Sequence, residues 1–409
     1  MTLLRVIFPA MLLVMSLSCG RAAGSKCGDG ADSSVQTVLE ESAAEADLTT
    51  YASHMADSLL SEMTLMERVG QCFMPTVYAK ADEESLGRLE YYTDSLKVGG
   101  IVLLKGDLEG ASELATRCMS ARIPLFTAID AEWGLGMRLV DAPDFPRNGH
   151  LPDEADELLL FDYGREVARE CRRVGINMVL GPVVDVVGSR RSFIGSRSFG
   201  GDPKRVADLG VAYARGVESC GVISVAKHFP GHGSPSGDSH RTLPVIGRSL
   251  NQLDSIDLYP FRRYIGEGLS GVMVGHLAVP AIDPAALPAA VSEVVIQRLL
   301  RNDLGFEGLV ITDALNMGGA AGYGAKDALK AGADIVIGMA DTPGEIAAVI
   351  AAVERGELDR ATIDAHCRRV LFHKILLGLG KSEMPSAYGL HEDVAGGSVS
   401  IRERMRRGY

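Results

Sequence analysis

The chain has 409 residues, of which 46% are hydrophobic and 23% are charged, so it is long and apolar enough to bury one large core or two medium ones. The formal net charge of -12 argues against a nucleic-acid-binding protein, because phosphate contacts need a concentrated basic face. The seven cysteines form no C-x-x-C pair and no dense, even framework, which argues against a zinc ribbon or a disulfide scaffold.

The first residues have the layout of a bacterial secretion signal. Arg5 precedes an apolar stretch over residues 6–14, and Met-Ser-Leu-Ser-Cys-Gly follows. Cys19 resembles the lipidated first residue of a mature lipoprotein. We therefore expect residues 1–18 to be a signal peptide, Cys19 to be a lipid anchor, and the protein to be secreted across the inner membrane, periplasmic or membrane-anchored. A signal cut elsewhere, or a buried amino-terminal helix, stays open.

The segment from residue 19 to residue 50 is small, polar and acidic without sustained periodicity, which predicts a flexible tether. The fold is expected to start near Tyr51. Soon afterwards Thr64 and Glu67 have the spacing of a capping box, in which the threonine side chain and the glutamate carboxylate satisfy each other's backbone N–H groups. A helix is therefore predicted to begin at Thr64.

Short apolar runs then alternate with amphipathic helical segments. Eight candidate strands occur, at residues 70–76, 99–104, 124–130, 176–184, 221–227, 271–276, 308–313 and 334–339. Segments such as 163–173, 206–217 and 292–301 carry apolar residues at i, i+3 and i+4. Almost wholly apolar strands fit a parallel sheet covered on both faces. The pattern predicts an α/β fold, a (β/α)8 TIM-type barrel over residues 51–381, followed by a polar tail over 382–409. The competing fold is an open doubly wound sheet, weakened because no G-x-G-x-x-G follows an early strand.

Polar residues stand where the predicted strands end. In such barrels the active site lies at the carboxyl ends of the strands, so these side chains should converge on one rim. They are Asp130, Asp185, Lys227, His228, His276 and Asp313. A polar pocket at this rim is the expected site.

Two chemistries fit these residue types. A metal-dependent hydrolase would use a ligand set drawn from His228, His232, His240, Asp238, Asp313 and Asp130. A glycoside hydrolase would use one carboxylate to attack the anomeric carbon and a second group to protonate the leaving oxygen. Lys227 beside His228 would put a cation inside the supposed metal site, and no H-x-H or H-E-x-x-H pattern occurs, so glycoside hydrolysis is favoured without metal or cofactor.

Six motifs occur in a familiar order. They are residues 63–71, 129–138 (Ile-Asp-Ala-Glu-Trp-Gly-Leu-Gly-Met-Arg), 197–200, 227–233 (Lys-His-Phe-Pro-Gly-His-Gly), 238–240 (Asp-Ser-His) and 311–317 (Ile-Thr-Asp-Ala-Leu-Asn-Met). Together they resemble glycoside hydrolase family 3 over residues 51 to about 390. The Asp-Ser-His triplet is similar to that of the family's β-N-acetylglucosaminidases, which act on cell-wall sugars.

The resemblance implies roles for individual residues. Asp313 matches the family's nucleophile, whose attack gives a covalent glycosyl-enzyme and net retention. His240 and Asp238 match an acid/base dyad in which the imidazole carries the proton and the carboxylate orients it. Positions that match the family's sugar-binding residues are Asp130, Arg138, Arg197, Lys227 and His228. The implied activity is a retaining, exo-acting β-N-acetylglucosaminidase that hydrolyses terminal N-acetylglucosamine from peptidoglycan fragments or related glycans.

The chain departs from the family pattern in two places. Trp133 and Gly134 stand where many relatives have two glycines, which puts the chain's single tryptophan near the sugar-binding rim, and residues 146–160 look divergent. Two rivals stay open: a non-catalytic lipoprotein that binds wall sugars, and phosphorolysis, because a neutral imidazole would not repel a phosphate anion. No protein partner is inferred.

Overall fold

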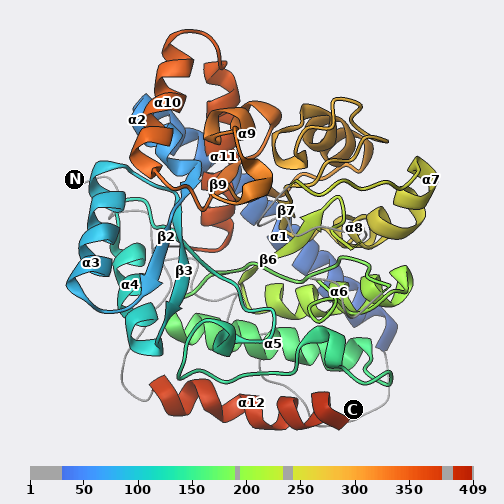
Figure 1. The fold of residues 1–409 in the computed structure, drawn as a ribbon. Coiled ribbons are helices and arrows are strands. Elements are labelled where there is room, and N and C mark those ends of the chain that lie inside the picture. The colour runs from blue at the N-terminus through green and yellow to red at the C-terminus, as the bar shows by residue number, and fades with distance from the viewer. Residues whose placement is uncertain (1–29, 189–193, 234–242, 380–389, 408–409) are drawn as a thin grey trace. The chain divides into compact units, whose positions relative to one another are not determined.

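A computed structural model describes residues 30–188, 194–233, 243–379 and 390–407 (Figure 1). The chain divides into two compact units, Met1–Thr50 and Tyr51–Tyr409. Helix α1 (Gly30–Glu62) begins inside the segment expected to be a flexible tether. This segment is rich in alanine, glutamate and serine and lacks a regular apolar stripe, so periodicity did not indicate the helix.

The described strands form one parallel sheet that closes on itself. Nine strands follow the order β1-β9-β8-β7-β6-β5-β4-β3-β2. Their bounds are β1 Phe73–Met74, β2 Thr76–Ala79, β3 Gly100–Gly106, β4 Phe126–Ile129, β5 Met178–Val179, β6 Ile223–Phe229, β7 Gly271–Val274, β8 Leu309–Ala314 and β9 Ile335–Ile337. β1 pairs with β9 and β2 pairs with β3. Because only Pro75 separates β1 from β2, this single stretch closes the barrel.

The predicted barrel is confirmed, but its first strand begins and ends later in the sequence than predicted. Residues 70 and 71 of the first predicted strand end helix α2 instead, and the strand residues extend to Ala79. Pro75 has no N–H to donate, which interrupts the pairing, yet its carbonyl still accepts a hydrogen bond from Val102 at 2.9 Å. The interruption therefore divides one barrel strand into two short ones.

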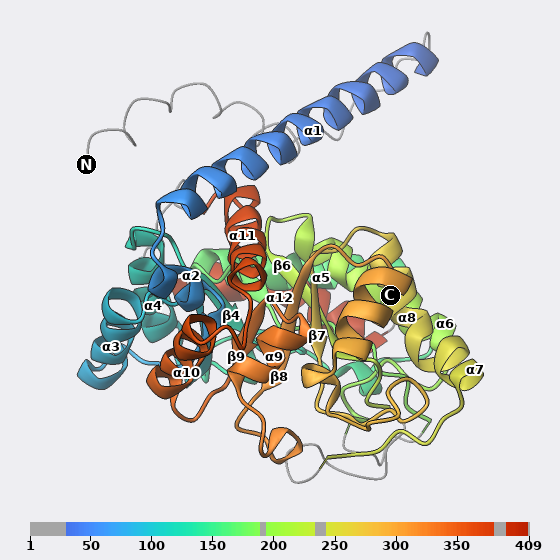
Figure 2. The same cartoon turned by 90° about the horizontal axis from the view of Figure 1, so that it is seen from above.

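Helices surround the strands (Figure 2). The α-helices of the barrel unit after α1 are α2 Leu65–Gln71, α3 Glu83–Glu90, α4 Leu108–Ser120, α5 Glu157–Val174, α6 Pro203–Glu218, α7 Leu250–Gln252, α8 Leu258–Gly266, α9 Ala325–Ala331, α10 Thr342–Glu354, α11 Arg360–Leu376 and α12 Leu390–Arg407. Short 3-10 helices are η2 Leu135–Met137, η3 Asn148–His150, η5 Ala289–Val291 and η7 Gly318–Ala320. Segments of the wider π-helix are η1 Tyr91–Ser95, η4 Leu253–Asp257 and η6 Val294–Asp303. The predicted capping box is present at the start of α2, where Thr64 N–H donates to Glu67 Oε2 at 2.9 Å.

The strands are buried on both faces. Along β3, Val102 faces the barrel interior, whereas Ile101 and Leu103 pack under the helices. Side chains from most of the strands fill the interior, among them Met74, Phe126, Met178, Val225, Met273, Ile311 and Ile337. The interior is therefore a packed apolar core, and polar chemistry is confined to the ends of the strands.

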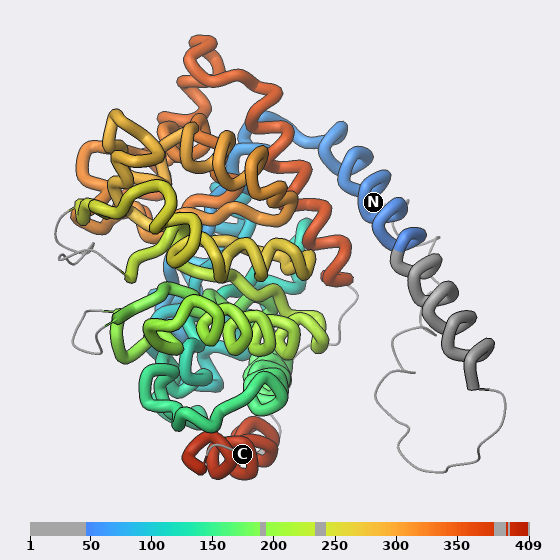
Figure 3. The backbone as a smooth tube through the Cα atoms, turned by 90° about the vertical axis from the view of Figure 1, so that its right-hand side faces the viewer, coloured from blue at the N-terminus to red at the C-terminus, as the bar shows by residue number. Residues whose placement is uncertain are grey.

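The segment expected to be a polar tail includes a packed helix, α12. Leu390, Val394 and Met405 are buried, and Arg404 Nη1 lies 2.7 Å from Asp162 Oδ2 of α5. Figure 1 and Figure 3 both show α12 alongside α5. Three apolar residues in a charged sequence suffice for this, because helical spacing gathers them on one side. In the part of the chain that the structure describes, no helix combines the length and apolarity needed to span a membrane.

Candidate active site at the carboxyl ends of the strands

Lys227 is the centre of the polar cluster at the mouth of the barrel. It lies near the end of β6 and is 2% exposed. Its Nζ lies 2.7 Å from Asp130 Oδ1 and 2.8 Å from Glu132 Oε1, just after β4. Arg138 pairs with the other oxygen of Asp130. The structure thus brings together three of the predicted sugar-binding residues, although nearly one hundred positions separate Lys227 from Asp130.

The carboxylates of this cluster are ionised. Burial alone would raise the pKa of Asp130, but Lys227 and Arg138 hold it well below its usual range. Burial acts in the same direction on Glu132, and Arg197 and Lys227 lower its pKa to about 2. Conversely, burial would lower the pKa of Lys227, and the two carboxylates raise it. The attraction between opposite charges therefore offsets the cost of burying each of these side chains.

Glu132 is a further site residue, which was not among those predicted from the sequence. Its carboxylate accepts two parallel hydrogen bonds from Arg197, at 2.8 Å from Nε and 2.7 Å from Nη2. This forked geometry fixes the plane of the guanidinium. The available signal was the Asp-Ala-Glu spacing after β4, which places a second carboxylate two residues beyond Asp130.

His228 is oriented by Asp185, which follows β5. His228 Nδ1 lies 2.8 Å from Asp185 Oδ2, and the backbone N–H groups of His228 and His232 donate to Oδ1 at 3.2 and 2.6 Å. Burial would raise the pKa of Asp185, yet the two histidines lower it. With Nδ1–H donating to this carboxylate, His228 Nε2 is left to accept from Arg197 Nη2 at 3.4 Å. Asp185 thus holds the whole 228–232 turn.

Asp313 lies at the end of β8, next to the cluster. Its Oδ1 accepts a hydrogen bond from the N–H of Ala314 at 2.8 Å. Burial would raise the pKa of Asp313, but His228 and His276 lower it. The side chain is therefore a carboxylate at neutral pH, the form in which it can act as a nucleophile.

The two remaining predicted catalytic residues, Asp238 and His240, lie outside the described residues. Their acid/base role therefore stays a prediction. The polypeptide is described up to Gly233 and again from Leu243.

The predicted metal-ligand set is largely committed to protein partners. Asp130 is bonded to Lys227 and Arg138, and His228 is bonded to Asp185. Within the described ranges, no group of three or more His, Cys, Asp or Glu side chains has an arrangement that could hold a metal ion.

Trp133 packs against the divergent segment after residue 146. The Arg147 guanidinium lies 4.5 Å from the centroid of the indole ring, and the tryptophan packs partly against the core. The neighbouring Asn148 donates from Nδ2 to the backbone carbonyl of Arg197 at 3.0 Å. The divergent segment after residue 146 thus braces the loop that carries Arg197.

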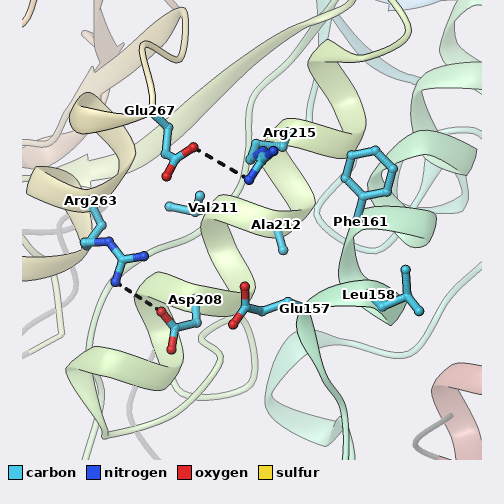
Figure 4. Close-up of a pocket in the computed structure, with 9 residues that line it drawn as sticks. All are labelled: Glu157, Leu158, Phe161, Asp208, Val211, Ala212, Arg215, Arg263 and Glu267. Atoms are coloured by element: carbon cyan, nitrogen blue, oxygen red, sulfur yellow. Dashed lines mark hydrogen bonds and ion pairs between the residues drawn. The ribbon is translucent and has the colours of Figure 1, made fainter. Parts of the chain in front are cut away.

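A separate pocket lies on the helical layer, away from the strand ends (Figure 4). Its floor consists of Phe161, Val211 and Ala212 from α5 and α6. The ion pairs Arg263–Asp208, at 3.2 Å, and Arg215–Glu267, at 3.7 Å, lie at its edge. None of the predicted site residues that the structure describes lines it.

Comparisons with known proteins identify relatives of the chain. The sequence profile of the glycosyl hydrolase family 3 N-terminal domain matches residues 64–372. A beta-hexosaminidase of Neisseria meningitidis serogroup C (strain 053442) is 37% identical over an alignment of 257 residues, and the match covers 59% of this chain and 71% of that protein. A beta-hexosaminidase of Nitrosospira multiformis is 37% identical over 258 residues, covering 59% of this chain and 73% of the relative.

Solved structures share the fold. A glycoside hydrolase family 3 beta-N-acetylglucosaminidase from Paenibacillus sp. str. FPU-7 superposes with a TM-score of 0.73 at 30% identity, over 82% of this chain and 68% of that chain. A beta-glucoside phosphorylase bound to 2FGlc superposes with a TM-score of 0.80 at 21% identity, over 87% of this chain and 66% of that chain. The second likeness concerns the fold alone.

Proposed function

The chain belongs to glycoside hydrolase family 3, and from that membership we propose that it is a retaining, exo-acting β-N-acetylglucosaminidase. Its substrates would be peptidoglycan fragments or related glycans with a terminal N-acetylglucosamine. The observation that carries the proposal is the ionised Asp313 at the end of β8, next to the ion-paired cluster at the barrel mouth. The names of the 37% identical relatives support the same substrate class.

The cluster would bind the hydroxyl groups of the terminal sugar. Lys227, Arg138 and Arg197 supply charged donors, and the carboxylates that pair with them can accept from hydroxyl groups. Because these ion pairs exist before substrate arrives, the groups do not reorganise during the reaction. This rigidity would place the anomeric carbon of the sugar against Asp313.

The proposed reaction has two steps. Asp313 attacks the anomeric carbon while His240 gives a proton to the glycosidic oxygen, so that the carbon–oxygen bond breaks and the leaving sugar departs with a hydroxyl group. Asp238 stabilises the imidazolium form of His240 before this transfer. In the second step His240 removes a proton from water, the hydroxide oxygen bonds to the anomeric carbon, and Asp313 is released. Two inversions give net retention.

Kinetics with an aryl N-acetyl-β-glucosaminide test the proposal. Asp313→Ala should lower kcat by about 10⁴-fold or more, and His240→Ala by about 10²- to 10⁴-fold, while Asp94→Ala on the surface serves as the matched control. A slow 5-fluoro substrate analogue should leave a sugar adduct on the peptide that contains Asp313. Activity within a few-fold of wild type in both site variants would sink the assignment.

The rival functions give different results in the same assays. Activity abolished by a chelator and restored by a metal would indicate the metal-dependent hydrolase, and saturable sugar binding without turnover would indicate a binding lipoprotein. Formation of a sugar phosphate when phosphate is added would indicate phosphorolysis. Release of one N-acetylglucosamine from the end of a defined peptidoglycan fragment, followed by mass spectrometry, is the expected result.

We also propose export and lipid anchoring at Cys19, in the periplasm or on a membrane. The support is the basic residue, apolar stretch and cysteine at the start of the sequence. Labelled palmitate should enter the wild-type protein and not the Cys19→Ser variant. Equal labelling of both proteins would contradict the anchor.

A further inference from the structure

His276 presents an unused hydrogen-bond acceptor beside the proposed nucleophile. The residue follows β7 and is fully buried. Its Nε2 lies 3.0 Å from the carbonyl oxygen of Ala314, and its Nδ1 has no hydrogen-bond partner among the described residues. A buried polar atom of this kind is costly unless another group satisfies it.

The contacts of His276 decide which atom carries the proton. A carbonyl oxygen only accepts, so Nε2 must be the N–H of the ring. Burial also lowers the pKa of His276, and the ring is therefore neutral near pH 7. It follows that Nδ1 carries a lone pair and can accept one hydrogen bond.

The position of His276 decides what could supply that hydrogen bond. β7 lies between β6 and β8 in the sheet, so the residue after β7 lies between His228 and Asp313. The Asp313 carboxylate acts to raise the pKa of His276, and His228 acts to lower it. The backbone packs closely there, because a Cβ at Gly275 would lie 3.1 Å from the Cβ of His228.

Carboxylate oxygens of Asp130, Glu132 and Asp313 already have protein donors. Lys227 and Arg138 bind Asp130, Arg197 binds Glu132, and the Ala314 N–H binds Asp313 Oδ1. In the proposed reaction Asp313 attacks C1 of the sugar, and the substituent on C2 is the nearest donor to that carbon. On N-acetylglucosamine this substituent is an acetamido N–H.

We propose that His276 Nδ1 accepts a hydrogen bond from the donor on C2 of the terminal sugar, the acetamido N–H, and thereby helps to select N-acetylglucosaminides. This inference rests on the proposed function. It makes His276 a specificity-determining residue, because a sugar without a donor on C2 would leave Nδ1 buried and unpaired.

Two substitutions separate this role from a purely structural one. His276→Gln places an amide nitrogen near the position of Nε2, which keeps a donor for the Ala314 carbonyl and removes the Nδ1 acceptor. His276→Asn places its amide oxygen near the position of Nδ1, which keeps the acceptor and gives up the Ala314 contact. The proposal predicts that Gln harms selectivity more than Asn, and a structural role predicts the reverse.

The experiment measures kcat/KM for an aryl N-acetyl-β-glucosaminide and an aryl 2-deoxy-β-glucoside with the three proteins. His276→Gln should lower the ratio of the two values by at least about 10-fold, and His276→Asn should change it by less than about 3-fold. The ratio does not depend on the fraction of folded protein. Equal losses on both substrates in the Gln variant, or the larger loss of selectivity in the Asn variant, would overturn the inference. A wild-type protein inactive on the N-acetyl substrate would instead refute the proposed function.

Discussion

A buried cluster of ionised side chains lies at each end of the barrel. At the carboxyl end, Lys227 joins Asp130 and Glu132. At the amino end, Asp334 precedes β9 and accepts from Arg301 at 2.6 Å, from His366 at 2.9 Å and from Arg369. In both clusters the carboxylates are held well below their usual pKa by neighbouring cations, against the opposing effect of burial.

The two clusters differ in whether their polar atoms have protein partners. At the amino end Arg301 also donates to the carbonyls of Phe306 and Gly308, and His366 donates to that of Leu329, so the contacts tie η6, the segment before β8, α9 and α11 together. At the carboxyl end, His276 Nδ1 is left without a partner among the described residues. Both clusters contain a carboxylate with a lowered pKa. Only the cluster around Lys227 lies at the carboxyl ends of the strands and has nearby an acceptor without a protein partner in the described part of the chain. Perturbed ionisation alone therefore does not identify the active site.

Removing one cation from each cluster gives the sharpest contrast. Lys227→Met should lower kcat/KM by about 10³-fold, because Asp130 and Glu132 lose their shared partner and the sugar loses a charged donor. Arg369→Met, the matched change at the amino end, should leave kcat/KM per folded molecule within about 2-fold. Similar kinetic losses in both variants would remove the distinction between the two clusters.

The amino-end cluster should act on stability instead. Asp334→Asn should lower the free energy of unfolding by about 3–5 kcal/mol, because three cationic or polar partners lose a buried charge. The pKa of Asp334 is lowered in the folded state, so its contribution exists above its unfolded pKa and is lost as pH falls below about 4. Urea unfolding at pH 7 and pH 3.5 measures both effects. A variant as stable as wild type at pH 7, but with impaired kcat/KM, would contradict this assignment.

The smallest predicted effect concerns Lys374, a cation at the amino end that has no anionic partner among the described residues. Lys374 is buried, its Nζ donates to the neutral amide of Gln71 at 2.7 Å, and burial lowers its pKa to about 7. Between that value and the unfolded pKa of about 10.4, the unfolded chain binds the extra proton. Stability should therefore rise from pH 7 to pH 9, by at most about 1.4 kcal/mol per pH unit.

Lys374→Met should flatten this rise, and Lys80→Met, on the surface, should leave it unchanged. Urea midpoints at pH 7, 8 and 9 provide the measurement. Parallel pH profiles for wild type and Lys374→Met would show that another group causes the dependence.

Much of the barrel could be predicted because its determinants are local. An apolar run that ends in Asp130, Lys227 or Asp313 identifies a buried strand and its polar end together. Helix α12 was missed because its buried apolar residues, Leu390, Val394 and Met405, are few and widely spaced in a charged sequence. The part of helix α1 before Tyr51 was predicted to be a tether, because it shows no apolar stripe in the sequence.

The sequence by itself determined the family, the alternation of strands and helices, and the residue types at the carboxyl ends of the strands. Only the tertiary structure decided which of those residues are partners. Glu132 meets Arg197 across 65 positions, and His276 meets the Ala314 carbonyl across 38. Neither contact has a local pattern, because closing the barrel brings strand ends together by their order in the sheet, whatever their separation along the chain.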